Sequence, residues 1–339
     1  MFSLFGSMYG RLADLRNTFY DRGIFKTNPL GAKTISIGNI TAGGTGKTPL
    51  VALIAEILAD NGETVCILTR GYGRKNPKRR VLVSDGKNVL ADAAMGGDEP
   101  VELARKLTGK SIIIADADRV SAAEWALDEF GVTVFVLDDG FQHRRARRDL
   151  DIVCVDATNP FGSGKMLPAG ILREPLKNLQ RAHVIVLTRA NLAGDIENLK
   201  AQISDLKLGL PLFTAENRIS DVNKLADFLA GISKPQSVET IPALAFCALG
   251  NPGNFFEQLR RDGFDIVTGK PLPDHHFYTL ENIADLEETA GNAKAEILLT
   301  TAKDAVKLNG LTFTMPCFVI DIQLDIDDEK DFHRLITSF

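Results

Sequence analysis

Large apolar side chains recur at three- and four-residue intervals near the N-terminus of this chain. They are Phe2, Phe5, Tyr9, Leu12, Leu15 and Phe19, whereas Ser3, Ser7, Asp14 and Asn17 fall on the opposite side. This spacing predicts an amphipathic helix over residues 2–20. The helix either packs on the protein's own core or lies in a membrane interface, with Arg11, Arg16 and Arg22 near lipid phosphates. The spacing alone leaves both interpretations open.

From Thr34 onward, short apolar runs alternate with helical segments. We expect a helix at Pro49–Asp60 and strands at Thr34–Ile37, Thr64–Leu68, Ser111–Ala115, Val132–Leu137, Asp151–Val155 and His183–Leu187. Continuous apolar runs of this kind are typical of strands that helices cover on both faces. The alternation predicts an α/β fold with a mostly parallel sheet.

The second half of the chain repeats this alternation after a more polar and less regular stretch, Lys207–Gln236. Further strands are expected at Ala243–Leu249, Asp265–Val267, Glu296–Leu299 and Cys317–Ile320. We therefore predict an N-terminal helix within residues 1–25, a larger α/β domain over 26–225 and a smaller α/β domain over 226–339.

Composition excludes some classes of protein. The 339 residues carry a net charge of −5, which argues against a general nucleic-acid binder. No run approaches the roughly 18–20 apolar residues of a membrane span, and the N-terminus lacks a signal-peptide layout. The four cysteines form no CxxC pair, so we expect buried free thiols and no zinc site.

A glycine-rich segment follows the first expected strand and precedes the helix. It resembles the Walker A pattern G-x-x-x-x-G-K-[ST], with Thr41 in place of the first glycine. Its glycines let backbone N–H groups converge on an anion, Lys47 reaches the β- and γ-phosphates, and Thr48 ligates Mg²⁺. The alternative is a glycine-rich turn with a chance Gly-Lys-Thr, but the strand–loop–helix context favours a nucleotide-binding P-loop. The residues expected to bind ATP are Thr41, Ala42, Gly43, Gly44, Thr45, Gly46, Lys47 and Thr48.

Two adjacent acids, Asp138 and Asp139, end the apolar run Phe135–Leu137. In P-loop enzymes an aspartate at such a strand end holds Mg²⁺. A lone acid there is often only a turn or cap residue, but a pair after a buried strand favours a metal site with Thr48.

These motifs resemble the tetraacyldisaccharide 4′-kinase family when they are taken together. The matching stretches are Gly38–Pro49, Thr69–Gly73, Gly97–Pro100, Leu137–Arg145, Arg148–Val153, Leu167–Gly170, Leu172–Pro175, Asp274–His276 and Thr301–Leu308. Ala302 departs from the last stretch, where the family pattern would have Glu. The resemblance implies that ATP and Mg²⁺ are used to phosphorylate the 4′-hydroxyl of a tetraacylated disaccharide 1-phosphate, giving lipid IVA.

The resemblance also has consequences for location and partners. It implies a peripheral, monotopic protein at the cytoplasmic face of the inner membrane of a Gram-negative bacterium. The N-terminal helix would touch the anionic membrane surface, where the lipid A precursor lies. No obligate protein partner is evident.

The resemblance places the catalytic base at Asp98, assisted by His275, with Lys47 acting on the phosphates. A carboxylate, alone or with histidine, can accept the proton of a sugar hydroxyl. From the sequence alone, Asp98 is equally a helix N-cap before Glu99-Pro100, and for His275 the residues themselves favour an exposed, idle loop position beside Pro273. If His275 acts, the second domain must close over the P-loop.

Our candidates for substrate contacts are basic and polar residues of the family-like stretches, with Arg74 from the basic cluster after Gly73 and Arg119 at a family-like position of its own. They are Arg70, Arg74, Arg119, Gln142, His143 and Arg173. Arginine suits phosphate because it donates two parallel hydrogen bonds. Whether the clusters at 70–80 and 144–148 are solvated faces or touch ligand or lipid stays open.

Two rival functions can be compared with the sequence. A P-loop GTPase or metallochaperone-type switch needs a guanine-reading [NT]KxD motif. Thr188–Asn191 has Arg for Lys and Asn for Asp, and in Thr301–Asp304 the Lys and Asp are adjacent, so both segments fail. The other rival, a nucleotide-binding scaffold without catalysis, differs from a kinase in lacking ATP turnover with the lipid acceptor.

Overall fold

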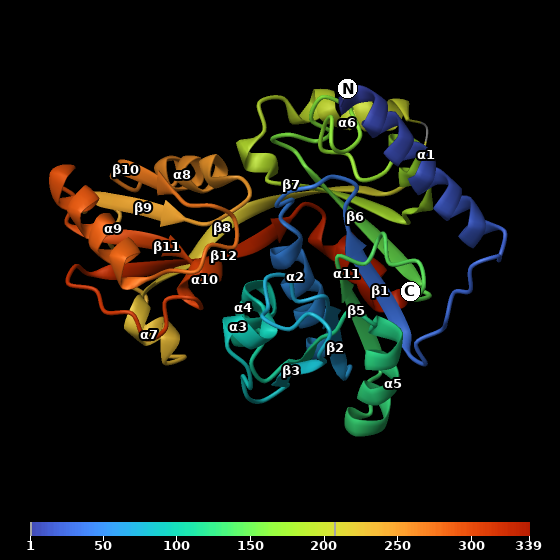
Figure 1. The fold of residues 1–339 in the computed structure, drawn as a ribbon, viewed down its shortest axis with the longest axis horizontal. Helices are drawn as coiled ribbons and strands as arrows, with labels where there is room; N and C mark the ends of the chain where they lie inside the picture. Colours follow the sequence, from blue (N-terminus) through green and yellow to red (C-terminus); the bar gives the residue numbers. More distant parts are fainter. Residues whose placement is uncertain (1, 207) are drawn as a thin grey trace.

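A single twelve-stranded sheet organises the molecule (Figure 1). The structure is a computed structural model that describes residues 2–206 and 208–339. The strand order is β10-β9-β11-β12-β8-β7-β6-β1-β5-β2-β4-β3. Among these described strands, every neighbouring pair is parallel except β3–β4 and β8–β12, which are antiparallel. The mostly parallel α/β sheet predicted from the apolar runs is therefore confirmed.

The first half of the chain builds one side of the sheet. Its strands are β1 (Lys33–Gly38), β2 (Val65–Thr69), β3 (Val81–Asp85), β4 (Ser111–Ala115), β5 (Val134–Asp138), β6 (Leu150–Asp156) and β7 (Val184–Thr188). Its helices are α1 (Phe2–Asp21), α2 (Lys47–Asp60), α3 (Ala93–Gly96), α4 (Asp98–Lys106), α5 (Arg119–Phe130) and α6 (Ile196–Asp205), with 3-10 turns η1 (Leu176–Arg181) and η2 (Ala190–Leu192). β1, β2, β4, β5, β6 and β7 are almost wholly buried, as continuous apolar strands covered on both faces must be.

The second half continues the same sheet. It contains β8 (Leu212–Lys224), β9 (Ala243–Cys247), β10 (Ile266–Pro271), β11 (Ile297–Thr301) and β12 (Cys317–Ile326). Its helices are α7 (Leu225–Leu229), α8 (Pro252–Arg261), α9 (Leu280–Asn292), α10 (Ala302–Ala305) and α11 (Glu329–Ser338). The four cysteines are free and buried, as expected from their apolar surroundings.

The polar and less regular stretch beginning at Lys207 contains a long strand that the sequence pattern did not predict. Lys207 itself lies outside the described residues, but β8 spans thirteen residues within that stretch. The strand pairs with β7 on one side and with β12 on the other, so it joins the two parts of the sheet. β3, at the sheet edge, was also missed. Both strands have many partly exposed positions, which weakens the apolar pattern that identifies a strand.

The C-terminal helix α11 returns to the first half of the molecule. Phe332 and Ile336 are buried in the hydrophobic core that also contains Leu50 and Ile54 of α2. The division into domains at residue 225 therefore remains a prediction, because the sheet and this core cross it.

Helix α1 docks on the molecule through its small and polar residues. Gly6 and Gly10 are buried against Met166, and a side chain at Gly6 would meet the Met166 carbonyl oxygen at 2.9 Å. The buried Asn17 donates a 2.7 Å hydrogen bond to the carboxylate of Glu174. Small residues let the helix lie close to the protein surface, so the docked side of α1 has few large apolar side chains.

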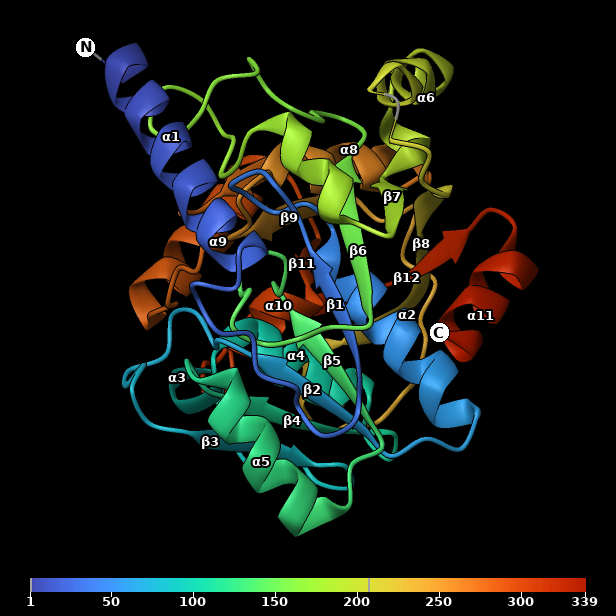
Figure 2. The same ribbon diagram turned by 90° about the vertical axis from the view of Figure 1, so that its right-hand side faces the viewer.

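The large apolar residues of α1 are exposed. The exposed fractions are 48% for Phe5, 56% for Met8, 41% for Tyr9, 59% for Leu12 and 49% for Leu15. Figures 1 and 2 show α1 along the outer edge of the molecule. No helix in residues 2–206 or 208–339 combines the length and apolar character that crossing a bilayer requires.

Candidate active site

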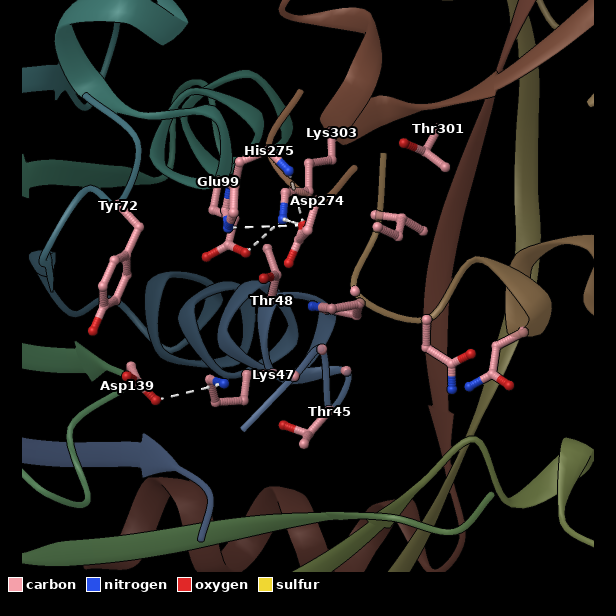
Figure 3. A pocket seen from close by; sticks show the side chains of 18 of the residues that line it. Thr45, Lys47, Thr48, Tyr72, Glu99, Asp139, Asp274, His275, Thr301 and Lys303 are labelled. Carbon is pink, nitrogen blue, oxygen red and sulfur yellow. Dashed lines mark hydrogen bonds and ion pairs between the residues drawn. The ribbon is translucent and has the colours of Figure 1, made fainter. Parts of the chain in front are cut away.

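A cavity of about 460 Å³ lies between the glycine-rich loop and the segments that follow β9, β10 and β11. In Figure 3, Lys47 and Thr48 of the loop lie on one side, and Asp274, His275 and Lys303 of the second half lie opposite. The halves also approach each other at Gly250, where an added Cβ would be 3.3 Å from the backbone nitrogen of Gly44. The two halves therefore enclose one site.

Two glycines give the loop its turn. Gly43 and Gly46 have φ angles of 106° and 71°, a region that other residues rarely adopt. Added Cβ atoms at Gly43 and Gly44 would meet no atom within 4 Å, so this part of the loop is open. Thr41, which replaces the first glycine of the motif, lies before the left-handed positions and forms a β-bridge with Leu172. The substitution is therefore compatible with the loop geometry.

Three residues outside the Walker A-like segment hold the loop in place. Asn39 donates to the carbonyl of Thr41 at 2.8 Å and to the Thr45 hydroxyl at 3.0 Å. Thr188, at the end of β7, donates to the Thr45 carbonyl, and the neighbouring Arg189 donates to the Gly44 carbonyl. Thr188-Arg189 is the pair that failed the guanine-motif test, and its structural task here is to support the phosphate loop.

The two acids after β5 have different environments. Asp139 accepts two-pronged hydrogen bonds from Arg173 and lies 3.5 Å from Lys47. Burial opposes ionisation, but Lys47 and Arg173 outweigh it and lower the pKa of Asp139 to about 2. Asp138 accepts a 2.8 Å hydrogen bond from the Thr69 hydroxyl. Burial, with repulsion from Glu99, raises the pKa of Asp138 to about 6.

This arrangement fits a divalent cation. Asp138 is 4% exposed and is destabilised as an anion, so a cation beside it would compensate a buried negative charge. Thr48 lines the same cavity as both acids. Carboxylate and hydroxyl oxygens are ligands that Mg²⁺ accepts, with phosphate oxygens completing its shell.

Asp98 and His275 form a pair across the cavity although they are 177 positions apart. His275 Nδ1 lies 2.8 Å from Asp98 Oδ2 and 3.1 Å from Oδ1. His275 lines the cavity, whereas Asp98 is only 5% exposed behind it. Helix α4 begins at Asp98 with Gly97 as its N-cap, so the alternative that Asp98 is the N-cap residue is wrong.

Positive charges surround this pair. Lys307 Nζ lies 3.6 Å from Asp98 Oδ2, and Lys303 Nζ lies 4.0 Å from it. Burial would raise the pKa of Asp98, but the hydrogen bond from His275 and these lysines together lower it. The same hydrogen bond raises the pKa of His275. Asp98 is therefore held as an anion.

Comparison with known proteins agrees with this geometry. A family model for tetraacyldisaccharide-1-P 4′-kinase matches residues 1–339. The chain belongs to this family. Two curated relatives named tetraacyldisaccharide 4′-kinase are each 37% identical to it. One, from Syntrophus aciditrophicus, aligns over 95% of this chain and 88% of its own, and the other, from Geobacter sulfurreducens, over 94% and 87%.

A solved structure extends the family likeness to the fold. It is a crystal structure of an "apo" form of LpxK from Aquifex aeolicus in complex with ATP. That structure is 32% identical to this chain, covers 98% of it and 96% of its own length, and superposes with a TM-score of 0.78.

The substrate candidates drawn from the family resemblance occupy different places. Arg70 and Arg173 line the cavity. Gln142 does not line it and donates to the carbonyl of Asn39, a residue that holds the phosphate loop, at 2.8 Å. Arg119 is 5% exposed, and burial lowers its pKa while Asp138 and Asp139 act in the opposite direction, so it lies near the acids.

Two of these candidates are more enclosed. Burial and the charge of Arg119 lower the pKa of His143 to about 4, so its ring is neutral at pH 7. The buried Arg74 donates to the carbonyls of Pro77, Arg79 and Ala115. Because these bonds direct its guanidinium at the backbone, we leave Arg74 out of the proposed substrate contacts.

Several cavity residues of this family member were not singled out from the sequence. They are Tyr9, Tyr72, Glu99, Asn217, Asn251, Asn254, Phe255, Gln258, Asp274 and Lys303. Lys303 donates to Glu99 at 2.9 Å, which links the two halves. Glu99, Asp274 and Lys303 belong to stretches that carried the family resemblance, so the sequence held a signal that could have identified them. The amide side chains on α8 and β8 belong to no recognisable motif.

Proposed function

We propose that this chain transfers the γ-phosphate of ATP to the 4′-hydroxyl of tetraacyldisaccharide 1-phosphate, forming lipid IVA. One observation carries the proposal: in a chain of this kinase family, His275, paired with the buried Asp98 behind it, lines the cavity that the phosphate loop also lines. A P-loop positions the donor, and a carboxylate–histidine pair opposite it accepts a proton from an alcohol.

The donor half of the site is formed by residues 41–48. Backbone N–H groups of the open turn at Gly43 and Gly44 and the start of α2 favour a phosphate group. Lys47 is 3.5 Å from Asp139 and can turn to a phosphate oxygen without leaving the cavity. Mg²⁺ bound by Thr48, Asp138 and Asp139 would neutralise charge on the transferred group.

The acceptor half is formed by the Asp98–His275 pair. The sugar hydroxyl loses its proton to this pair as its oxygen forms a bond to the γ-phosphorus and the bond to ADP breaks. The ring of His275 reaches the cavity, and the anionic carboxylate of Asp98 stabilises the added proton. Arg70, Arg119, Gln142, His143 and Arg173 are the proposed substrate contacts.

Helix α1 brings the site to the lipid. Its exposed row of Phe5, Met8, Leu12 and Leu15 favours burial in a membrane interface, and Tyr9 of the same helix lines the cavity. Because the acceptor's acyl chains stay in the bilayer and ATP is cytosolic, we place the protein peripherally at the cytoplasmic face of a bacterial inner membrane. We propose no obligate protein partner and no nucleic acid.

The direct test is transfer of labelled γ-phosphate to purified disaccharide 1-phosphate. We expect label in a lipid product that carries a 4′-phosphate, with ATP as donor and a requirement for Mg²⁺. ATP hydrolysis without a labelled lipid, or transfer from GTP in preference to ATP, would contradict the proposal. The guanine-reading alternative has no observation in its favour, since Thr188 and Arg189 are engaged with the loop.

A further inference from the structure

A second cavity, of about 230 Å³, has a strongly basic lining. It is lined by Thr27, Arg144, Arg147, Arg148, Asp151, Arg181 and His183, and we call it the arginine pocket. It shares no lining residue with the active-site cavity. The pocket lies where the chain leaves α1, because Arg144 donates to the Asn17 carbonyl and pairs with Asp21 at 2.7 Å.

The cations of this pocket are held in place. Arg148 donates to the carbonyls of Gly140 and Phe141, and its Nε lies 2.9 Å from Asp151. The guanidinium of Arg181 lies 4.1 Å from the centre of the Phe141 ring and pairs with Glu174. Fixed guanidinium groups lose little conformational entropy when an anion binds.

The pocket retains unused positive charge and unused donors. Arg147 is exposed and has no ion pair among the described residues. The buried Nε of Arg181 has no acceptor. His183 accepts the Asp151 N–H at its Nδ1, so its remaining proton is on Nε2, where it can be donated. Burial lowers the pKa of Arg181, with repulsion from Arg144 and Arg148 acting in the same direction and the acids Glu174 and Asp151 acting in the opposite one.

The surroundings of the pocket favour a lipid over a free anion. Ile24 and Phe25, which precede Thr27, are 59% and 41% exposed. Phe25 packs edge-on against Tyr20, and Arg144 lies 5.2 Å over the ring of Tyr20. Exposed apolar and aromatic residues beside arginines match the layering of a membrane interface, with rings among the acyl ends and cations at headgroup depth.

We propose that the arginine pocket binds the phosphate group of an anionic phospholipid headgroup and anchors the end of α1 at the bilayer. Arginine forks match phosphate oxygens bidentately, and the exposed fork of Arg147, which has no ion pair among the described residues, stands beside the fixed positive charges of Arg144, Arg148 and Arg181. This inference rests on the membrane placement proposed above, and it adds a defined lipid site to it. The bound lipid is part of the membrane and is not the reacting substrate.

The test compares Arg147→Glu with Arg260→Glu in the full-length protein. Both arginines are exposed, neither has an ion pair among the described residues, and Arg260 lies on α8 in the other half. Binding is measured by flotation with vesicles of phosphatidylcholine alone and of phosphatidylcholine with phosphatidylglycerol. We expect Arg147→Glu to weaken binding to the anionic vesicles about tenfold, because each basic residue near an anionic surface contributes to binding. Arg260→Glu should leave it nearly unchanged, and neutral vesicles should not separate the variants.

Three outcomes would overturn the proposal. If Arg147→Glu and Arg260→Glu lost the same amount of binding to anionic vesicles, the effect would come from net charge alone. If Arg147→Glu weakened binding to neutral vesicles as much as to anionic vesicles, the effect would come from the contact of α1 with the bilayer and not from a lipid phosphate. Saturable binding of inorganic phosphate that Arg147→Glu abolishes, with vesicle binding unchanged, would assign the pocket to free phosphate. Transfer to acceptor in detergent micelles separates this proposal from the kinase proposal, because Arg147→Glu should retain that activity.

Discussion

Lys47 lies between an acid and the open turn of the phosphate loop. Its ammonium group is 3.5 Å from Asp139, and its side chain is 16% exposed. A nucleotide phosphate bound in this cavity would be a second negatively charged partner for Lys47, besides Asp139. Asp139 also has Arg173, so its charge stays compensated when Lys47 turns away.

Replacing Lys47 by Ala should reduce phosphate transfer by about 100-fold or more, because a fixed charge on the transition state is lost. Steady-state transfer kinetics measure this change. The melting temperature should change little, since Arg173 continues to pair with Asp139. The exposed Lys87→Ala is a matched control in the same half. Near-normal transfer by Lys47→Ala would remove this lysine from the mechanism.

The pair of Asp98 and His275 can be separated by two conservative variants. Asp98→Asn keeps the shape but removes the charge, and we expect kcat to fall by about 10²- to 10⁴-fold, the usual contribution of a general base. His275→Gln should lower kcat less if Asp98 can act alone. Affinity for ATP, measured by calorimetry, should change little in both variants, since neither residue belongs to the phosphate loop.

Asp128→Asn, at an exposed position on α5, controls for loss of one acidic charge. An unchanged kcat for Asp98→Asn with saturating acceptor would reduce Asp98 to a structural residue at the first turn of α4.

At the scale of the element, α1 is unusual because its polar and small residues face the protein. Asn17 is 4% exposed and bonded to Glu174, whereas Leu12 is 59% exposed. A helix that is stabilised by the protein core has the opposite arrangement. The exposed row therefore adds little to folding stability, and its side chains are free to contact the apolar region of a membrane.

Changing Phe5, Met8, Leu12 and Leu15 together to Ser should weaken vesicle flotation by about 100-fold or more, since each large apolar side chain contributes about 1.5–3 kcal/mol when fully removed from water. The melting temperature should remain near that of the wild type because these residues are already exposed. Serine at the exposed Leu90, Ile232, Val267 and Leu280 gives a control in which four apolar side chains are lost elsewhere on the surface. Equal flotation of the two variants would return α1 to a purely structural role.

At the scale of the whole molecule, ionic contacts close the second half over the first. Lys303 of α10 donates to Glu99 of α4 at 2.9 Å, and His275 reaches Asp98 of the same helix. Site assembly and the packing of the two halves therefore depend on some of the same residues. Stability that comes from such contacts should depend on pH.

The pH dependence of the His275–Asp98 contact has a definite sign. The pKa of Asp98 is below its ordinary 3.8, so its contribution is present above that value and is lost as pH falls through the lowered pKa. The pKa of His275 is above its ordinary 6.5, so its contribution is full below that value and is lost as pH rises through the raised pKa. The contact is strongest between these two ordinary values.

We therefore expect the difference in melting temperature between the wild type and His275→Gln to be largest in mildly acidic buffer and to shrink as pH rises above the raised pKa of His275. Thermal denaturation of both proteins over a pH series measures this difference in melting temperature. His333→Gln, an exposed change on α11, should give no such trend. A difference that grows with rising pH would contradict the assigned ion pair.

Local patterns were sufficient for much of the fold and for the donor half of the site. The apolar run Ser111–Ala115 is β4 to the residue, and the glycine-rich loop lies between β1 and α2 as its motif requires. These features could be predicted because the residues that form each pattern are close together in the chain and also form the structure that the pattern predicts. β8 could not, since its alternation is broken by partly exposed polar positions.

By itself, the sequence determined the strand-and-helix alternation, the loop that favours a phosphate and the spacing of an amphipathic α1. Only the tertiary structure decided that Asp98 meets His275, that Thr188 and Asn39 hold the loop, and that α1 turns its large side chains outward. The physical reason is range: backbone preference and periodicity act between near neighbours in the chain. Contacts between residues far apart depend on how the sheet brings its strand ends together, which no local pattern encodes.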